Sequence, residues 1–142
     1  MDIPDAIEPS VGWRAWNIID TNEGPRVGSI NAGMVWPAGR KFEAVCRFPH
    51  DVPDPHCSCG VYAARTRAHL QKMGYHFFDL DEDRLVIIGQ VNLWGGIVPG
   101  SQGWRAQFAY PKNFHVPYSM WRYATLLRKT YAVPTVLNNT LR

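Results

Sequence analysis

The residues of this sequence best suited to chemistry are three cysteines and two histidines in one short stretch. Cys46, Cys57 and Cys59 are all the cysteines of the chain, and His50 and His56 lie between the first two of them. Thiolates and imidazoles are the usual donors of tetrahedral structural zinc sites, which need four of them. His50 follows Cys46 by four residues, a comfortable knuckle spacing, whereas His56 adjoins Cys57 and would need a tighter backbone. The pattern therefore predicts a structural zinc ion bound by Cys46, His50, Cys57 and Cys59, with His56 as the alternative fourth ligand.

Two other readings of these cysteines remain open. Free cysteines are commonly small buried hydrophobic residues, so the three thiols can also belong to a proline-rich loop without metal. A reactive cysteine would need a neighbouring base, and His56 or His69 could serve Cys57 or Cys59 in that role. A site with four protein donors leaves no open position for substrate, which argues against catalysis at the metal.

The pattern around this loop predicts a small mixed fold. Lys41–Cys46 alternates polar and apolar side chains and runs into the cysteine loop, while a segment rich in helix formers follows Gly60 and stops at Gly74. Apolar residues at helical spacing from Met120 to Tyr131 predict a second helix. Further strands are expected at 11–19, 26–30, 34–36, 84–94 and 104–110, the last two as a hairpin, and helices at 62–73 and 120–131.

This order of elements predicts an α+β domain, built on a small, strongly bent antiparallel sheet or barrel with two helices and a metal-binding loop. PUA-like domains, which read modified bases, offer a fold analogy. Residues 1–10 read as an extended N-terminal arm, 11–134 as a single globular domain and 135–142 as a C-terminal tail.

The charge of the chain is uneven, although its net charge of +3 is ordinary. Residues 1–83 contain eight Lys or Arg and twelve Asp or Glu, whereas residues 84–142 contain seven basic residues and no acidic one. A basic portion of this kind is typical of proteins that bind polyanions, nucleic acid above all. The alternative is that both portions fold together and their opposite charges pair across the surface.

Cysteine usage and hydropathy predict a cytoplasmic protein without a membrane partner. An odd number of cysteines, two of them one residue apart, fits a secreted disulfide framework poorly. No apolar run approaches the ~20 residues that a bilayer span needs. The first residues are acidic, whereas a signal peptide would begin basic and continue apolar.

Aromatic residues beside polar or basic ones predict a ligand site. The chain has six tryptophans. Side chains two residues apart on a strand share a face, so Gln90, Asn92 and Trp94 would combine hydrogen-bonding groups with a stacking surface. Such a surface suits a flat base read by its edge. The alternative is that the tryptophans form the core. The predicted ligand-binding residues are Trp13, Arg14, Trp16, Trp36, Gln90, Asn92, Trp94 and Arg105.

Several blocks of the sequence resemble a family of small proteins from actinobacteria and their phages, over roughly residues 11–134. The most recognisable is the Cys-x-Cys-Gly-[Ile/Val]-Tyr-Ala block, present as Cys57–Ala63. The resemblance implies a single-domain cytosolic protein, supports the metal loop and carries no established activity. The other matching blocks are 12–16, 36–39, 89–95, 103–111 and 131–134.

These features together predict a non-enzymatic binding module for nucleic acid or a nucleotide, modified ones included, stabilised by structural zinc. The alternative is a small phage or host regulator that binds a protein partner through exposed aromatic residues. A third hypothesis is a cysteine-dependent enzyme using Cys57 or Cys59, His69 and the acidic run 79–83. Phosphate-binding loops, nucleophile elbows and zinc-protease motifs are absent from the sequence.

Overall fold

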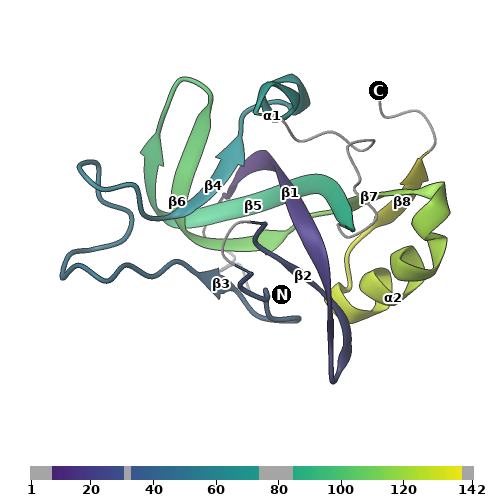
Figure 1. Cartoon of the computed structure of the whole chain (residues 1–142). Helices are drawn as coiled ribbons and strands as arrows, with labels where there is room; N and C mark the ends of the chain where they lie inside the picture. Colours follow the sequence, from purple (N-terminus) through teal and green to yellow (C-terminus); the bar gives the residue numbers. More distant parts are fainter. Residues whose placement is uncertain (1–7, 31–32, 74–84, 139–142) are drawn as a thin grey trace.

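The computed structural model describes residues 8–30, 33–73 and 85–138 of the chain (Figure 1). The strands in this part are β1 (Ser10–Thr21), β2 (Gly24–Gly28), β3 (Phe42–Glu43), β4 (Val61–Ala64), β5 (Val86–Pro99), β6 (Gly103–Pro111), β7 (Phe114–Pro117) and β8 (Thr135–Asn138). The helices are α1 (Arg67–Lys72), α2 (Trp121–Tyr131) and the short 3-10 helix η1 (Tyr118–Met120).

Four antiparallel strands close into a small barrel. β1 pairs with β5 from Ser10–Leu93 to Asn17–Val86, β5 pairs with β6, and β6 pairs with β4. Trp13 of β1, opposite Ala64 of β4, completes the ring. Gly12 permits this close approach, because a Cβ there would lie 2.6 Å from the Cβ of Ala63. The predicted α+β class with a small, strongly bent antiparallel barrel is confirmed.

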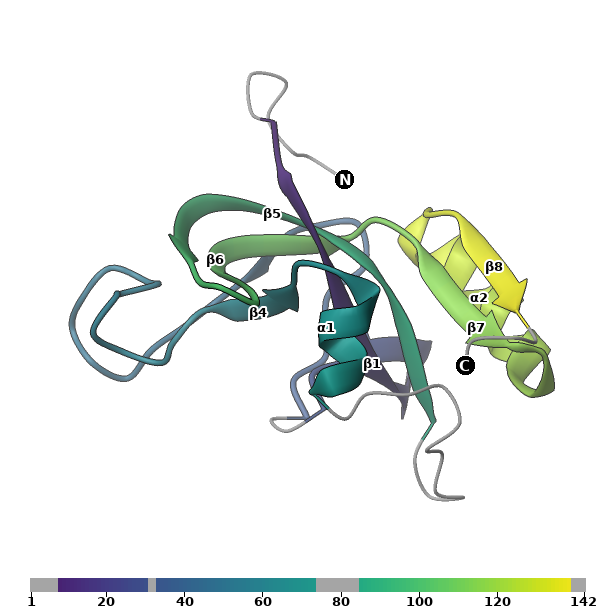
Figure 2. The same cartoon turned by 90° about the horizontal axis from the view of Figure 1, so that it is seen from above.

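The other strands and α2 extend the barrel. β2 forms a hairpin with β1, β3 pairs with β6, β7 pairs with β5, and β8 lies parallel to β7. α2 packs against β2, β7 and β8. Two views at right angles place α2, β7 and β8 at one end of the molecule and the loop of residues 44–60 at the other (Figures 1 and 2). Neither α-helix of the described residues has the length and apolar composition needed to cross a bilayer.

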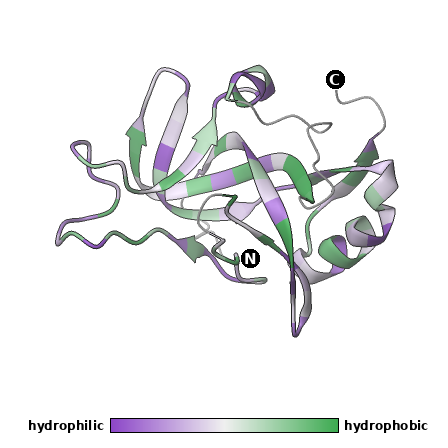
Figure 3. Ribbon diagram, in the orientation of Figure 1, coloured by the Kyte–Doolittle hydropathy of each residue, from purple (hydrophilic) through white to green (hydrophobic). Residues whose placement is uncertain are grey.

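The core consists mainly of side chains from the inner faces of the strands. Hydrophobic residues alternate with more polar ones along the barrel strands (Figure 3). The larger cluster centres on Trp16, Trp36 and Phe114, all fully buried, and Trp16 meets the other two rings edge to face. A smaller cluster lies under α1 and joins Leu70 to Ile88. The barrel interior is therefore filled with side chains.

The helix expected at 62–73 is wrong over its first half. Val61–Ala64 form β4 instead and pair with Gly103–Ala106 of β6. Helix-forming side chains such as Ala63 and Ala64 fit this position because they are buried between strands, and tertiary pairing overrides their intrinsic propensity. α1 begins only after Thr66, whose hydroxyl oxygen accepts a hydrogen bond from the backbone N–H of His69.

The chain ends differ in part from expectation. Thr135–Asn138, expected as the start of a tail, form β8 beside β7, a strand that the pattern did not indicate. The predicted second helix is present as α2, preceded by η1 after Pro117. Most of the predicted N-terminal arm and the acidic run 79–83 lie outside the described residues.

Candidate metal centre and adjoining groove

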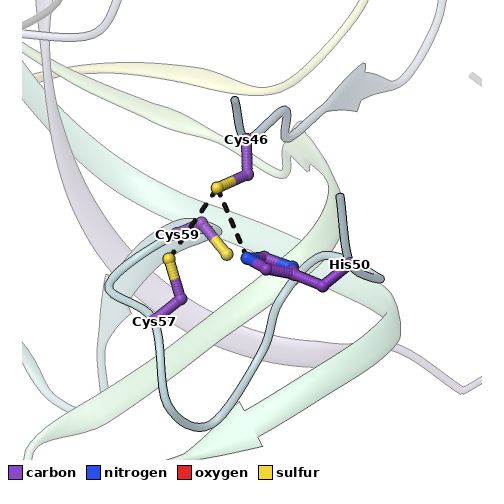
Figure 4. Close-up of side chains that lie close together, drawn as sticks. All are labelled: Cys46, His50, Cys57 and Cys59. Atoms are coloured by element: carbon purple, nitrogen blue, oxygen red, sulfur yellow. Dashed lines mark hydrogen bonds between the residues drawn. The ribbon is translucent and has the colours of Figure 1, made fainter. Parts of the chain in front are cut away.

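Three thiols and one imidazole converge in the loop between β3 and β4 (Figure 4). Cys46 lies shortly after β3, while Cys57 and Cys59 directly precede β4, so the two sides of the loop each bring donors to a common point. One donor atom from each of Cys46, His50, Cys57 and Cys59 lies within 4.8 Å of all the others, and all four residues are partly buried. This cluster could hold a metal ion. His56, the alternative ligand, is not one of its members.

The imidazole of His50 is oriented for metal binding. Its Nδ1 lies 2.8 Å from the carbonyl oxygen of Asp51. Because a carbonyl only accepts hydrogen bonds, Nδ1 carries a proton, which leaves Nε2 as the nitrogen that a metal ion would bind after Nε2 loses its proton. Nε2 faces the cluster, 3.5 Å from Sγ of Cys46. A backbone carbonyl that fixes the histidine tautomer in this way is typical of the outer partners of metal-bound imidazoles.

The spacing of the donors suits a tetrahedral ion. Sγ of Cys46 lies 3.7 Å from Sγ of Cys57 and 3.5 Å from Nε2 of His50. With metal bonds of ~2.3 Å to sulfur and ~2.0–2.1 Å to nitrogen, a tetrahedron has edges of about 3.8 Å between two sulfurs and about 3.5 Å between sulfur and nitrogen. Two edges of the cluster thus already have the required length.

The thiols of Cys57 and Cys59 differ in acidity. A hydrogen bond from the backbone N–H of Cys59, followed by one from the His50 side chain, lowers the pKa of Cys57 to about 7. Partial burial raises the pKa of Cys59. The hydrogen bond to the Asp51 carbonyl, followed by one to Cys57, raises the pKa of His50. As the pH rises, Cys57 therefore becomes a thiolate at a lower pH than Cys59 does.

Arg105 of β6 fixes the cysteine loop to the barrel. Its Nη1 donates to the carbonyl oxygens of Asp54 at 3.2 Å, of Cys59 at 2.7 Å and of Cys57. Gly60 completes the turn with φ of +115°, and a Cβ there would lie 3.0 Å from the Cβ of Arg105. The sequence pattern selected Arg105 as a ligand-binding residue, whereas these contacts give it a second, supporting role for the metal loop.

An open groove of about 890 Å³ adjoins the metal loop. It runs across β4 between the described residues of the segments 29–30 and 34–45 and the β5–β6 turn, and Pro55 and Gly60 of the metal loop belong to its wall. Arg14 and Arg105 are the charged side chains among the described residues that line it, and none of these lining residues is acidic. The volume falls within the range of about 300–1,000 Å³ that is typical of ligand sites.

The structure divides the predicted ligand-binding residues into two groups. Trp13, Arg14 and Arg105 line the groove. Trp16, Trp36 and Trp94 are buried in the core, with 0%, 0% and 3% of their surface exposed. Rings buried to this extent offer no face to a ligand, so the core alternative describes these three tryptophans.

The polar residues on β5 are also structural. The Gln90 side chain accepts a hydrogen bond from the Asn113 side chain at 2.8 Å, and its backbone N–H donates to the Asn113 side-chain oxygen at 2.9 Å. These bonds tie β5 to the turn before β7. Asn92 lies partly buried in the middle of the barrel wall, between Val11 and Tyr110. The strand face of Gln90, Asn92 and Trp94, which was predicted to bind a flat base, is therefore not an open surface.

Two groove residues were missed in the sequence. Tyr62 and Trp104 both line the groove, but their side chains lie on opposite faces of the β4–β6 pair, because Tyr62 is opposite Arg105 and Trp104 is opposite Ala63. An arginine lies over each ring: Arg105 is 5.9 Å from the centre of Tyr62, and Arg65 is 4.5 Å from that of Trp104. Assigning Tyr62 to a helix hid the alternation that places it on the outer face.

Opposite charges do not pair widely in the described parts of the chain. Between residues of these parts the structure has one ion pair, Arg26 with Glu23, at 3.7 Å. Both residues belong to the acidic first portion of the sequence. Described basic residues after position 84, such as Arg122, Arg128 and Lys129 on the exposed face of α2, are thus not in ion pairs with described acidic residues.

The cluster and the groove are features of the described residues that bear on function. Comparison of the chain with models of protein families, with curated proteins and with solved structures finds no match.

Proposed function

We propose that this chain is a non-enzymatic binding module for nucleic acid or a nucleotide, stabilised by a structural zinc ion at Cys46, His50, Cys57 and Cys59. The observation that carries the metal half is the converging donor set, with a His50 tautomer directed at it and two edges of tetrahedral length. Three thiolates and one imidazole form a donor set typical of structural zinc.

The binding half is supported by the charge and surface chemistry around the groove. The groove contains two arginines and no acidic side chain among its described residues, and aromatic rings lie beside arginines along it. Polyanions that expose flat rings match both properties, because phosphates attract guanidinium groups and bases stack on aromatic side chains. Nucleic acid meets both conditions.

The closed donor set favours binding over catalysis. With four protein ligands on the ion, no position remains for water or substrate. Metal binding would also occupy the thiolate of Cys57, which lies within 4.8 Å of three further donors, and this disfavours a nucleophilic role for it. The zinc ion would instead fasten β3 to β4 and support one wall of the groove.

Metal content tests the first half of the proposal. Protein purified from zinc-supplemented culture should contain about one zinc per chain by inductively coupled plasma mass spectrometry. Cys57→Ser and His50→Ala should each lower the stoichiometry strongly, while His56→Ala, in the same loop but outside the cluster, should not. Protein that contains no zinc after purification from zinc-supplemented culture would refute the zinc site.

Binding of oligonucleotides over a range of salt concentrations tests the second half. Fluorescence anisotropy with a labelled single strand should show affinity that falls linearly on a log–log plot as salt rises, because each phosphate contact releases counterions. Absence of binding at low salt, together with no nucleic acid or nucleotide in the purified protein by mass spectrometry, would exclude this half of the proposal.

A protein-binding regulator is the second candidate, and the surface around α2 supports it. Several large hydrophobic side chains are exposed there, at Tyr118, Trp121, Leu126 and Val136. Exposed aromatic residues in one region are common in protein interfaces. Such an interface would respond little to salt, so the salt titration separates the two candidates.

A further inference from the structure

The groove presents one aromatic ring openly beside two cations. Tyr62 leaves 46% of its surface exposed on the outer face of β4. Nη1 of Arg14 donates a hydrogen bond to the backbone carbonyl of Tyr62 at 2.7 Å, so this guanidinium lies beside the Tyr62 backbone. Arg105, directly opposite Tyr62 in the β4–β6 pair, lies over the ring at 5.9 Å from its centre. A flat ligand stacked on the other face of the Tyr62 ring would therefore have cations nearby.

We infer that this groove binds a single strand of nucleic acid, with one base stacked on Tyr62 and the adjoining phosphate beside Arg14. The inference rests on the proposed function and adds its site. Charge complementarity carries it, since the described lining residues contribute two arginines and no acid.

A single strand fits the groove better than a duplex. Bases in a duplex are stacked on one another and show only their edges, whereas unpaired bases expose a face to aromatic side chains. The Trp104 ring lies on the opposite face of the β4–β6 pair and is covered by the guanidinium of Arg65 at 4.5 Å, so Tyr62 is the ring that this face of the groove offers to a base.

The structure provides matched controls at the opposite end of the molecule. Tyr118, next to α2, leaves 53% of its surface exposed, similar to Tyr62, but lies outside the groove. The Tyr62 hydroxyl donates to the carbonyl of Ser58 at 2.9 Å, so Tyr62→Phe removes this bond and keeps the ring. Comparing Tyr62→Ala with Tyr62→Phe thus separates ring stacking from support of the metal loop.

The experiment measures affinity for a short fluorescein-labelled single strand by anisotropy, with zinc-loaded protein. Tyr62→Ala should weaken binding by about 5- to 150-fold, the range for losing one base–aromatic stack. Tyr62→Phe, which keeps the ring, should lose much less affinity than Tyr62→Ala, and Tyr118→Ala should bind like the unaltered protein. Arg14→Gln should reduce the slope of log affinity against log salt by about 0.7, the value for one phosphate contact on a single strand.

Photocrosslinking of the unaltered protein to a thiouridine-containing strand gives a reading that does not depend on variant folding. Crosslinks should map to the peptide containing Tyr62. Crosslinks on α2, or equal affinity of Tyr62→Ala and the unaltered protein, would overturn the groove assignment while leaving nucleic-acid binding intact. No binding by the unaltered protein at low salt would overturn the proposed function as well.

Discussion

The two neighbouring cysteines of the metal loop should behave differently in the metal-free chain. Cys57 accepts a hydrogen bond from the backbone N–H of Cys59 and faces His50, which brings its pKa to about 7, whereas burial raises the pKa of Cys59. The thiolate is the reactive form of a cysteine. Near neutral pH, Cys57 therefore carries far more thiolate than Cys59, although only one residue separates them.

Alkylation measures this difference. With zinc removed, iodoacetamide at pH 7 should modify Cys57 faster than Cys59, and the rate at Cys57 should rise as pH passes about 7 and then level off, because ionisation is complete above the pKa. Bound zinc should protect both residues. Peptide mass spectrometry follows each site separately, and equal rates at Cys57 and Cys59 over this pH range would contradict the assigned acidities.

For single residues, the sequence allowed the metal donors to be predicted, but it did not show which tryptophans are buried. Cys46 and His50 are four residues apart, so local spacing already limits where their side chains can meet. Burial of Trp16 depends on Trp36 and on Phe114, and Phe114 lies about a hundred residues further along the chain. A polar neighbour in the sequence, such as Arg14 beside Trp13, says nothing about which ring faces the core, because strand neighbours point to opposite sides.

Among the elements, α2 is tied to the first hairpin by the hydroxyl of Tyr131. This hydroxyl accepts a hydrogen bond from the backbone N–H of Val27 at 2.9 Å and donates one to the carbonyl of Trp36 at 2.7 Å, both buried. Tyr131→Phe should lower the free energy of unfolding by about 1–3 kcal/mol, because it leaves buried backbone groups without their partner. Urea denaturation measures the change. Tyr118→Phe, at an exposed tyrosine, should stay within about 0.5 kcal/mol of the unaltered protein.

The same tyrosine predicts a loss of stability in alkali. Burial raises the pKa of Tyr131 to about 12 in the folded chain, while an unfolded tyrosine ionises near pH ~10. Its contribution to stability is therefore complete below pH ~10 and is lost as pH rises to about 12, because only the unfolded state gains from deprotonation. Thermal melts of Tyr131→Phe should fall less steeply over this range, and parallel curves for both proteins would exclude this cause.

Strongly periodic elements were predictable, and short ones depended on their partners. Met120, Tyr123 and Leu127 share one helical face, so α2 was indicated by its own sequence. β4 has four residues and takes its conformation from β6, whose position is set by β5. The error at 62–73 arose here, since Ala63 and Ala64 favour a helix locally and are held in a strand by pairing at long range.

For the whole molecule, the core and the metal loop form separate parts. The larger core cluster draws its fully buried residues from the strands, α2 and Trp36. Within the loop 45–60, which is described throughout, Val52 is the residue that packs against this cluster. A chain of 142 residues is also long enough to bury a core without a metal. The barrel should therefore stay folded when the zinc ion is removed, unlike small zinc fingers, which unfold without metal.

Hydrogen–deuterium exchange after chelation tests this separation. Removing zinc, or introducing Cys57→Ser, should speed amide exchange in residues 44–62, because the loop then loses the ion that joins its two sides and keeps hydrogen bonds such as those to Arg105 and Tyr62. Exchange in β1, β5 and α2 should be unchanged, since their contacts lie within the barrel and at the opposite end. His56→Ala serves as the control and should match the zinc-loaded protein throughout. Faster exchange over the entire chain would mean that the metal holds the whole fold, and the barrel would then have to be regarded as metal-dependent.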